Sequence, residues 1–159
     1  MKRLSNSLMP PLQPVLKKIG WALLAVSLLG FIDAAYLSAK FYLGETPTCF
    51  LLKGCDVVTT SSYSSVAGVP IALFGALFYL AVFVLSLAFL DRRAPKLLKW
   101  IGAISVPGFL FTLYLVYLQF FVLHALCIYC MFSALTSTTV FVLALIGMRL
   151  LRRTQVNAV

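Results

Sequence analysis

The chain has 159 residues, of which 62% are apolar and only 11% are charged, and its formal net charge is +9. A soluble domain has about half apolar and a quarter charged residues, so this composition excludes a soluble protein and indicates an integral membrane protein. The length allows about four spans of roughly 20 residues each, with no room for a separate soluble domain. The basic residues are split among short segments with no aromatic surface between them, which argues against nucleic-acid binding.

Four apolar stretches follow one another along the chain, each long enough to cross about 30 Å of hydrocarbon as a helix. We therefore predict an all-α membrane protein, a four-transmembrane-helix bundle, in a single domain. The first stretch is too long, and too poor in a small-residue cleavage site, for a removed signal peptide. The predicted spans are 19–43, 69–90, 97–123 and 126–150, within a membrane domain of residues 19–150 that has an outer loop at 44–68.

Eleven of the thirteen basic residues lie before the first stretch, between the second and third, or after the fourth. The positive-inside bias then places both ends of the chain, residues 1–18 and 151–159, in the cytoplasm. The same charges suit contact with the anionic headgroups of the lipid bilayer. The eleven are Lys2, Arg3, Lys17, Lys18, Arg92, Arg93, Lys96, Lys99, Arg149, Arg152 and Arg153.

The four cysteines fall in two pairs on the opposite, outer side of this predicted bundle. Cys49 and Cys55 lie in the loop between the first two spans, and Cys127 and Cys130 lie at the start of the fourth. In a bacterium with this topology, that side of the inner (cytoplasmic) membrane is the periplasm, where disulfides form and persist. The placement predicts a thiol–disulfide relay.

The Cys127-Ile128-Tyr129-Cys130 motif has the spacing of one helical face. A thiol at a helix N-terminus meets the positive end of the helix dipole, so a reactive cysteine of low pKa is expected here. Two alternatives remain open for an isolated motif. The cysteines could be small apolar packing residues, or zinc ligands, although zinc would need all four thiolates or help from His124. We predict no metal site.

Cys49 and Cys55 lie in segment 44–65, whose proline, glycines and hydroxyl residues are typical of a loop. A pair with five intervening residues can close a disulfide and open it again. A purely structural bridge is the alternative, but it does not explain why a second pair lies at the same membrane surface. Exchange between the pairs, through a mixed disulfide, explains both.

Electrons that reach the Cys127 and Cys130 pair need an acceptor, and a membrane offers a lipid-soluble quinone. Cys130 is one turn deeper than Cys127, so it is the better candidate to face a buried ring. Nearby aromatic residues are candidates to line such a pocket, with ordinary helix packing or lipid contact as the alternative. They are Phe74, Phe78, Tyr114, Tyr117 and Phe121.

In the order of these elements the chain resembles the vitamin K epoxide reductase (VKOR) family, specifically its bacterial homologues that drive disulfide formation. The matching segments are GFIDAAYL at 30–37, the cysteine pair of the loop, SSYSSVAGVPIALFGALFY at 61–79 and CIYC at 127–130. The resemblance covers residues 27–143. The DsbB family, also four-helix and quinone-linked, carries its CxxC motif in the first outer loop, so its order is the reverse of this one.

The resemblance implies roles for the four cysteines. Cys49 would exchange with a periplasmic, DsbA-like thioredoxin-fold protein, Cys55 would pass the electrons to a Cys127–Cys130 bridge, and Cys130 would meet the quinone, either menaquinone or ubiquinone. Some bacterial relatives carry a fused thioredoxin-like domain, which this sequence lacks, so we expect a separate partner.

The resemblance also implies that Ser61 lies on a short half-helix that caps the site. Asp33 and Tyr36 belong to a matching segment, and an ionisable group within a span is a functional candidate. A hydrogen-bonded structural carboxylate is the alternative for Asp33. The animal enzymes carry a tyrosine four residues after the second CxxC cysteine, where this chain has Ala134, which argues against epoxide reduction.

The expected function is that of a membrane thiol oxidase, which passes electrons from a thioredoxin-fold protein through two cysteine pairs to a quinone and so supports disulfide formation. Two alternatives stay open. One is a quinone or epoxide reductase of the same fold, whose reduced quinone is the product. The other is a non-enzymatic four-span scaffold with structural disulfides.

Overall fold

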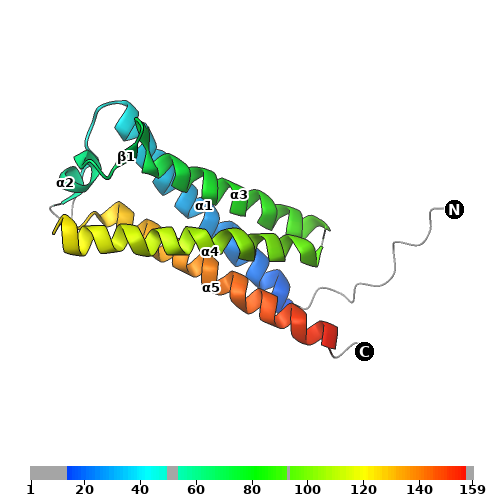
Figure 1. Ribbon diagram of the computed structural model, residues 1–159. Helices are drawn as coiled ribbons and strands as arrows, with labels where there is room; N and C mark the ends of the chain where they lie inside the picture. Colours follow the sequence, from blue (N-terminus) through cyan, green and yellow to red (C-terminus); the bar gives the residue numbers. More distant parts are fainter. Residues whose placement is uncertain (1–13, 50–53, 93, 157–159) are drawn as a thin grey trace.

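The computed structural model describes residues 14–49, 54–92 and 94–156. Lys2, Arg3 and Arg93, which are part of the predicted charge pattern, lie outside the described residues. The elements in order are α1 (Pro14–Tyr42), α2 (Cys55–Thr60), β1 (Ser65–Val66), β2 (Val69–Pro70), α3 (Ile71–Arg92), α4 (Pro95–Tyr117), the π-helical turn η1 (Leu118–Val122) and α5 (Ile128–Val156) (Figure 1).

Within the part of the chain that the structure describes, four helices are long and apolar enough to cross a membrane, which confirms the predicted four-span bundle. They are α1, α3, α4 continued by η1, and α5. The first described helix begins at Pro14, where a proline is tolerated because its missing N–H has no partner in a first turn. Because the number of these spans is even, α1 begins and α5 ends at one end of the bundle, and α2 and β1 lie at the other (Figure 1).

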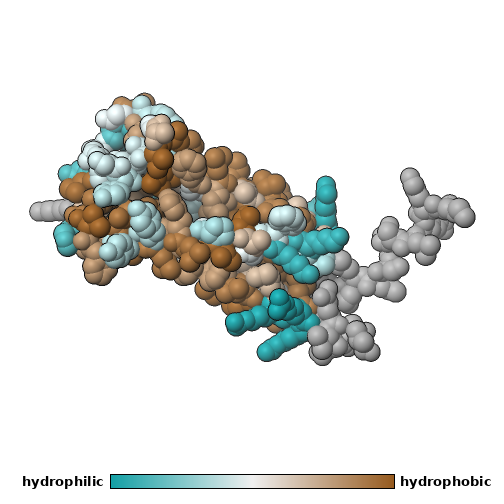
Figure 2. Space-filling model, in the orientation of Figure 1, coloured by the Kyte–Doolittle hydropathy of each residue, from teal (hydrophilic) through white to brown (hydrophobic). Residues whose placement is uncertain are grey.

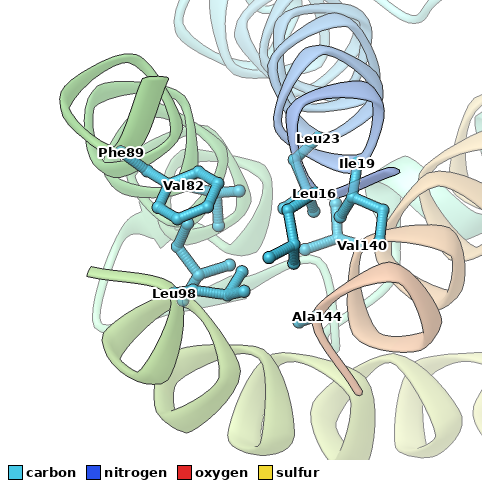
Figure 3. Packing of buried hydrophobic residues seen from close by; sticks show 9 residues of the cluster. Leu16, Ile19, Leu23, Val82, Phe89, Leu98, Val140 and Ala144 are labelled. Atoms are coloured by element: carbon cyan, nitrogen blue, oxygen red, sulfur yellow. The ribbon is translucent and has the colours of Figure 1, made fainter. Parts of the chain in front are cut away.

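Buried apolar residues pack into one cluster in the half of the bundle where α1 begins; Figure 3 shows their packing from close by. Each of the four spans contributes side chains to it, so the helices hold one another in place through this cluster. Close packing is helped by small residues, as is usual between membrane helices. The cluster consists of Leu16, Ile19, Leu23, Val82, Phe89, Leu98, Ile101, Val140 and Ala144.

The outer half of the bundle is organised around Tyr79 of α3. A Cβ atom added to Gly30 of α1 would lie 2.4 Å from the Tyr79 ring, so only glycine allows the two helices to approach this closely. The Tyr79 hydroxyl hydrogen-bonds the Thr136 hydroxyl (2.7 Å) and donates to the Ser133 carbonyl of α5 (2.7 Å). A fully buried phenol therefore links three of the four spans.

The lateral surface of the bundle is apolar. Figure 2 shows hydrophobic residues along its length and hydrophilic ones gathered at the two ends. Trp21 and Trp100 are more than half exposed and lie near the start of α1 and of α4, at the end that carries the chain termini. Tryptophan is enriched at membrane interfaces, so this end has the residues of a headgroup boundary.

A two-stranded hairpin closes the connection between α2 and α3, where the sequence predicted only a loop. Ser65 pairs with Pro70 and Val66 with Val69, around Ala67 and Gly68. Both turn residues have positive φ, 51° and 80°, as the tightest hairpin turns require. The Ile71 N–H donates to the Ser64 carbonyl (2.9 Å), so the hairpin leads directly into α3.

The connection between η1 and α5 is short and tightly bonded. His124 has a left-handed backbone (φ 47°), which turns the chain after the π-helical turn. The Leu123 N–H donates to the Leu118 carbonyl (2.9 Å) and the Ala125 N–H to the Gln119 carbonyl (3.2 Å). Because α5 begins at Ile128, two residues later than predicted, Cys127 precedes the helix and does not belong to its first turn.

Candidate active site

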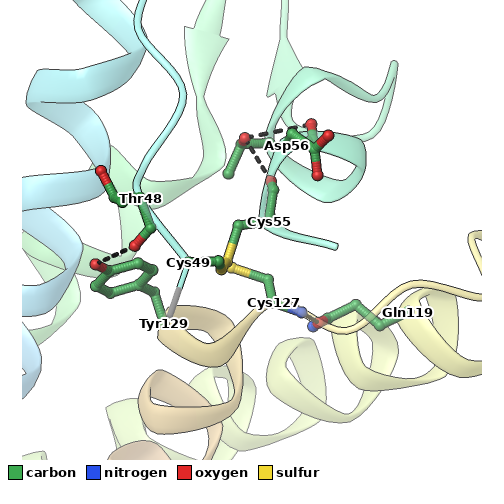
Figure 4. Close-up of a disulfide and its surroundings, with 8 residues drawn as sticks. Thr48, Cys49, Cys55, Asp56, Gln119, Cys127 and Tyr129 are labelled. Carbon is green, nitrogen blue, oxygen red and sulfur yellow. Dashed lines mark hydrogen bonds between the residues drawn. A yellow bond between two sulfur atoms is a disulfide. The ribbon is translucent and has the colours of Figure 1, made fainter. Parts of the chain in front are cut away.

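Two contacts bring the cysteine pairs together at the end of the bundle opposite the chain termini. A Cβ atom on Gly54, next to Cys55, would lie 2.9 Å from both the backbone N and O of Leu126, next to Cys127. The Tyr129 hydroxyl donates to the carbonyl of Thr48, next to Cys49, at 3.1 Å. The loop pair therefore rests on the segment that opens α5, and Figure 4 shows the Cys127 side chain pointing toward the disulfide.

The loop pair is bonded and the helix pair is not. Cys49 and Cys55 form a disulfide with their Cα atoms 6.1 Å apart, a usual separation for a bridge. Cys127 and Cys130 are free thiols. Cys55 and Cys127 are both buried, at 1% and 0% exposure, so exchange between them would take place out of water.

Cys127 is the N-cap residue of α5. Its carbonyl accepts the Met131 N–H (3.0 Å), and its sulfur accepts from the Cys130 thiol and from the backbone N–H groups of Cys130 and Tyr129. The Cys130 thiol is the largest influence, and together with these N–H groups it lowers the pKa of Cys127 from 9.0 to about 7, although burial opposes the shift. This agrees with the reactive thiol expected from the CxxC motif.

This pKa can be checked directly. With the loop disulfide intact, we expect the ultraviolet absorbance of a thiolate to appear as the pH rises through about 7, because the thiol loses its proton above its pKa. In a Cys130→Ala variant the strongest donor is lost, so the midpoint should move up toward the unshifted pKa of 9.0. A midpoint that stays near 7 in the variant would contradict the assigned cause.

Gly54 offers a test of the contact between the pairs. In Gly54→Ala the added methyl group meets the backbone of Leu126, which cannot rotate away as a side chain can. We expect a loss of about 1–3 kcal/mol in the free energy of unfolding. Transfer between the pairs, followed by alkylation and mass spectrometry, should slow by about 10- to 100-fold. Gly75→Ala is the control, because its Cβ would meet Ala34 at an ordinary 3.6 Å; equal effects in both variants would contradict the contact.

A cavity of about 750 Å³ lies beside the helix pair, between the spans and beneath the segment that follows α2. Its lining includes Cys130, predicted to face the quinone, Ser61, predicted to cap the site, and two of the five aromatic candidates, Phe74 and Phe78. Cys127 is not part of the lining, so the two thiols of the motif face different surroundings. Ala134 is also part of the lining, at the position where the animal enzymes have a tyrosine.

Tyr117, another of the aromatic candidates, does not line this cavity. It is 54% exposed and stacks on Phe121, with ring centroids 5.0 Å apart. The face of α4 that lines the cavity carries Pro107, Gly108, Phe111, Thr112 and Leu115, so Tyr117 lies on a different face of the helix from this cavity. Tyr114 and Phe121, also candidates from the sequence, are likewise absent from the lining and at least half exposed.

Ser61 lies directly after α2 as its C-cap residue, not within the helix. Its hydroxyl donates to the Val58 carbonyl (2.8 Å), and its carbonyl accepts the Ser64 N–H (2.9 Å). These bonds fix the turn between the short helix and the hairpin. Ser61 therefore reaches the cavity from above, on the segment that covers it.

Asp33 and Tyr36 lie one turn apart on α1. Asp33 is 9% exposed, and its Oδ2 atom is buried without a hydrogen-bond partner. The Tyr36 ring packs on the Tyr129 ring of the CxxC motif, with centroids 5.3 Å apart, and Lys40 lies over its face. The sequence analysis considered a hydrogen-bonded structural carboxylate as the alternative role of Asp33, but its Oδ2 atom accepts no hydrogen bond.

Gln119 is a site residue that the sequence analysis missed. Its side-chain Oε1 accepts the Cys127 N–H (3.0 Å), and its backbone carbonyl accepts the Ala125 N–H. It is 2% exposed and lies in η1, and such π-turns are frequent at functional sites. The available signal was a lone amide in an apolar stretch, eight residues before Cys127.

The family model described as the Vitamin K epoxide reductase family matches residues 21–145 of this chain. The chain belongs to the vitamin K epoxide reductase family. The match begins within α1, ends within α5 and includes both cysteine pairs. As a member of the vitamin K epoxide reductase family, the protein is a membrane oxidoreductase. The resemblance inferred from the motifs is thereby confirmed.

Proposed function

We propose that the protein oxidises a periplasmic, DsbA-like thioredoxin-fold protein and passes the electrons through its two cysteine pairs to a quinone, so that disulfide bonds form in secreted proteins. The observation that supports this most is the seating of the loop disulfide on the segment that opens α5. Gly54 touches the Leu126 backbone, and Tyr129 binds Thr48. A purely structural bridge would not require a low-pKa thiol directed at it.

In the proposed sequence, a thiolate of the partner attacks Cys49, which breaks the Cys49–Cys55 bond and releases the Cys55 thiolate. Cys55 then attacks Cys127 in an oxidised Cys127–Cys130 bridge and releases Cys130. A second thiol of the partner attacks the partner's sulfur in the mixed disulfide with Cys49, which releases the Cys49 thiolate and leaves the partner with a disulfide. Cys49 then attacks Cys55 in the Cys55–Cys127 bond, which restores the loop disulfide and leaves the helix pair as two thiols, the state the structure presents. One electron pair thus moves from the partner to Cys127 and Cys130.

Gln119 and the first turn of α5 hold Cys127 for this exchange. The Cys127 N–H is fixed by Oε1 of Gln119, while the thiolate is stabilised by the N–H groups of Tyr129 and Cys130. Cys127 is also a good leaving group, because a thiol of lower pKa leaves faster in disulfide exchange. Cys127 can therefore both form a disulfide bond with Cys55 and leave from it as a thiolate.

The cavity fits a quinone ring. Phe74, Phe78 and Phe111 supply aromatic surface, Cys130 borders the space, and its volume of about 750 Å³ lies in the usual range for small-molecule sites. A bound quinone, menaquinone or ubiquinone, would supply the two-electron acceptor that the helix pair needs. The segment carrying Ser61 would keep water away from Cys130.

The proposed orientation follows from charge. The described basic residues at the end with the chain termini include Lys17, Lys18, Lys96, Lys99 and Arg149, which suits the cytoplasmic side of a bacterial inner membrane. Both termini would then be cytoplasmic, with the cysteines on the periplasmic side. We keep 19–150 as the membrane domain, with its outer loop at 44–68.

The test is an anaerobic titration of the purified protein with a dithiol in the presence of a quinone, with quinone absorbance as the readout. We expect one quinone to be consumed for each dithiol, at a rate proportional to the amount of protein. Parallel runs with menaquinone and ubiquinone would identify the better acceptor. A protein whose disulfide resists the dithiol, or whose reduction leaves quinone absorbance unchanged, would be a scaffold with structural bridges.

A further inference from the structure

Asp33 is a buried acid that the relay described above does not use. All four acidic residues lie in the described part of the chain, and Glu45, Asp56 and Asp91 are exposed while Asp33 is 91% buried. Its Oδ2 has no hydrogen-bond partner. A carboxyl group within a span, without a cation or a complete set of donors, is costly to keep charged. Such a group is well suited to hold a proton.

Two contacts bracket Asp33 and fix what it faces. One turn deeper on α1, Gly30 touches the Tyr79 ring, and one turn outward Tyr36 packs on Tyr129. Asp33 therefore lies where α1 meets α3 and α5, the two spans packed against it. The titratable groups within electrostatic range of it are Tyr79 from α3, Tyr129 and Cys130 from α5, and Cys127 just before α5.

Cys127 and Asp33 compete for one negative charge. Two anions close together in a dry region repel each other strongly, so one of them keeps its proton while the other is ionised. The nearest lysine along α1 does not relieve this repulsion, because Lys40 is paired with Glu45. A thiolate at Cys127 is therefore compatible with a protonated Asp33, and a carboxylate at Asp33 with an uncharged sulfur.

Building on the proposed function, we propose that Asp33 stores the proton of the Cys127 thiol and returns it when the helix pair is oxidised. In the reduced state Cys127 is a thiolate, Cys130 a thiol and Asp33 a neutral acid. When the Cys127–Cys130 bond forms, two electrons and two protons pass to the quinone, one proton from Cys130 and one from Asp33. The next reduction of the bridge by the loop pair returns both protons. Asp33, Cys127 and Cys130 together then carry one negative charge in both the reduced and the oxidised state.

Difference infrared spectroscopy of the full-length protein tests this without quinone turnover. The helix pair is reduced with a dithiol and oxidised with a chemical oxidant. We expect a protonated carboxyl band in the reduced protein that is replaced by a carboxylate band after oxidation. The change should be absent in Asp33→Asn and present in Asp91→Asn, the exposed control. No such change in the wild-type protein would overturn the proposal, whether or not the protein reduces quinone.

Two variants provide a second test. In Asp33→Asn, which cannot hold the proton, we expect dithiol-driven quinone reduction to fall by about 100-fold. The thiolate of Cys127 should form at lower pH, because its competitor for the charge is gone. Asp33→Glu keeps a carboxyl group and should recover much of the rate. A folded Asp33→Asn protein with the wild-type rate and thiolate titration would overturn the proposal, as would a folded Asp33→Glu protein as slow as the amide variant.

Discussion

Replacing Cys130 by alanine should reduce quinone reduction to below about 1% of the wild-type rate, with either a small dithiol or a protein as the electron donor. The expected loss is large because Cys130 is the thiol of the pair that lines the cavity, while Cys127 is enclosed beside the loop disulfide. Without Cys130 the helix pair cannot form a disulfide, so the two electrons have no route into the cavity.

The measurement is the initial rate of loss of quinone absorbance in detergent or lipid nanodiscs, under anaerobic conditions. Met131→Ala, one residue further along α5 and not part of the cavity lining, is the matched control and should keep most of the rate. Circular dichroism would show that the helices of the Cys130 variant are intact. Full turnover by folded Cys130→Ala would contradict the role assigned to this sulfur.

Replacing Cys49 by alanine should separate the two kinds of donor. Cys49 is half-buried at the outer end and Cys55 is fully buried, so a protein partner can reach the first far more easily than the second. We expect the variant to lose oxidation of a thioredoxin-fold protein almost completely. A small dithiol can reduce the helix pair directly, so its rate should stay within about two- to threefold of the wild type.

Both donors should be assayed on the same preparation, with quinone loss as the common readout. Thr48→Ala is the control, since Tyr129 binds the backbone carbonyl of Thr48 and the substitution leaves this bond in place. Equal losses with both donors would show that Cys49 is needed beyond partner docking. Retained activity with the protein donor would place the point of attack on another cysteine.

The four spans were predictable because apolar length alone determines them. Each predicted stretch overlaps a helix of the structure, and the ends differ by a few residues where local bonds decide. The start of α5 is the instructive case. The apolar stretch begins at Leu126, so the sequence predicted a helix from that residue. In the structure the Gln119 side chain accepts the Cys127 N–H, and Cys127 is the N-cap residue of α5. The mean hydropathy of a segment cannot reveal a hydrogen bond between residues eight positions apart.

The site was predictable in its sulfur and less so in its surroundings. The two cysteine pairs are rare residues with recognisable spacing, and charge placed them at one end. The sequence did not show that Tyr117 lies away from the cavity, because α4 carries aromatic residues on more than one face and only its packing decides which face meets the cavity. Tyr79 was missed as the residue that joins α1, α3 and α5, since its partners Gly30 and Ser133 are distant in sequence.

Because Cys127 caps α5, a change in its redox state should also change the hydrogen bonds at the start of this helix. A sulfur tied into a Cys127–Cys130 bridge can no longer serve as a full acceptor for the N–H groups of Tyr129 and Cys130 that it binds as a thiolate. The first turn of α5 would thus be held by these hydrogen bonds when the helix pair is reduced and would lose them when the helix pair is oxidised. Because the Tyr129 hydroxyl in that turn also donates to the Thr48 carbonyl, a change in this turn would reach the loop that carries Cys49, where the partner is proposed to bind.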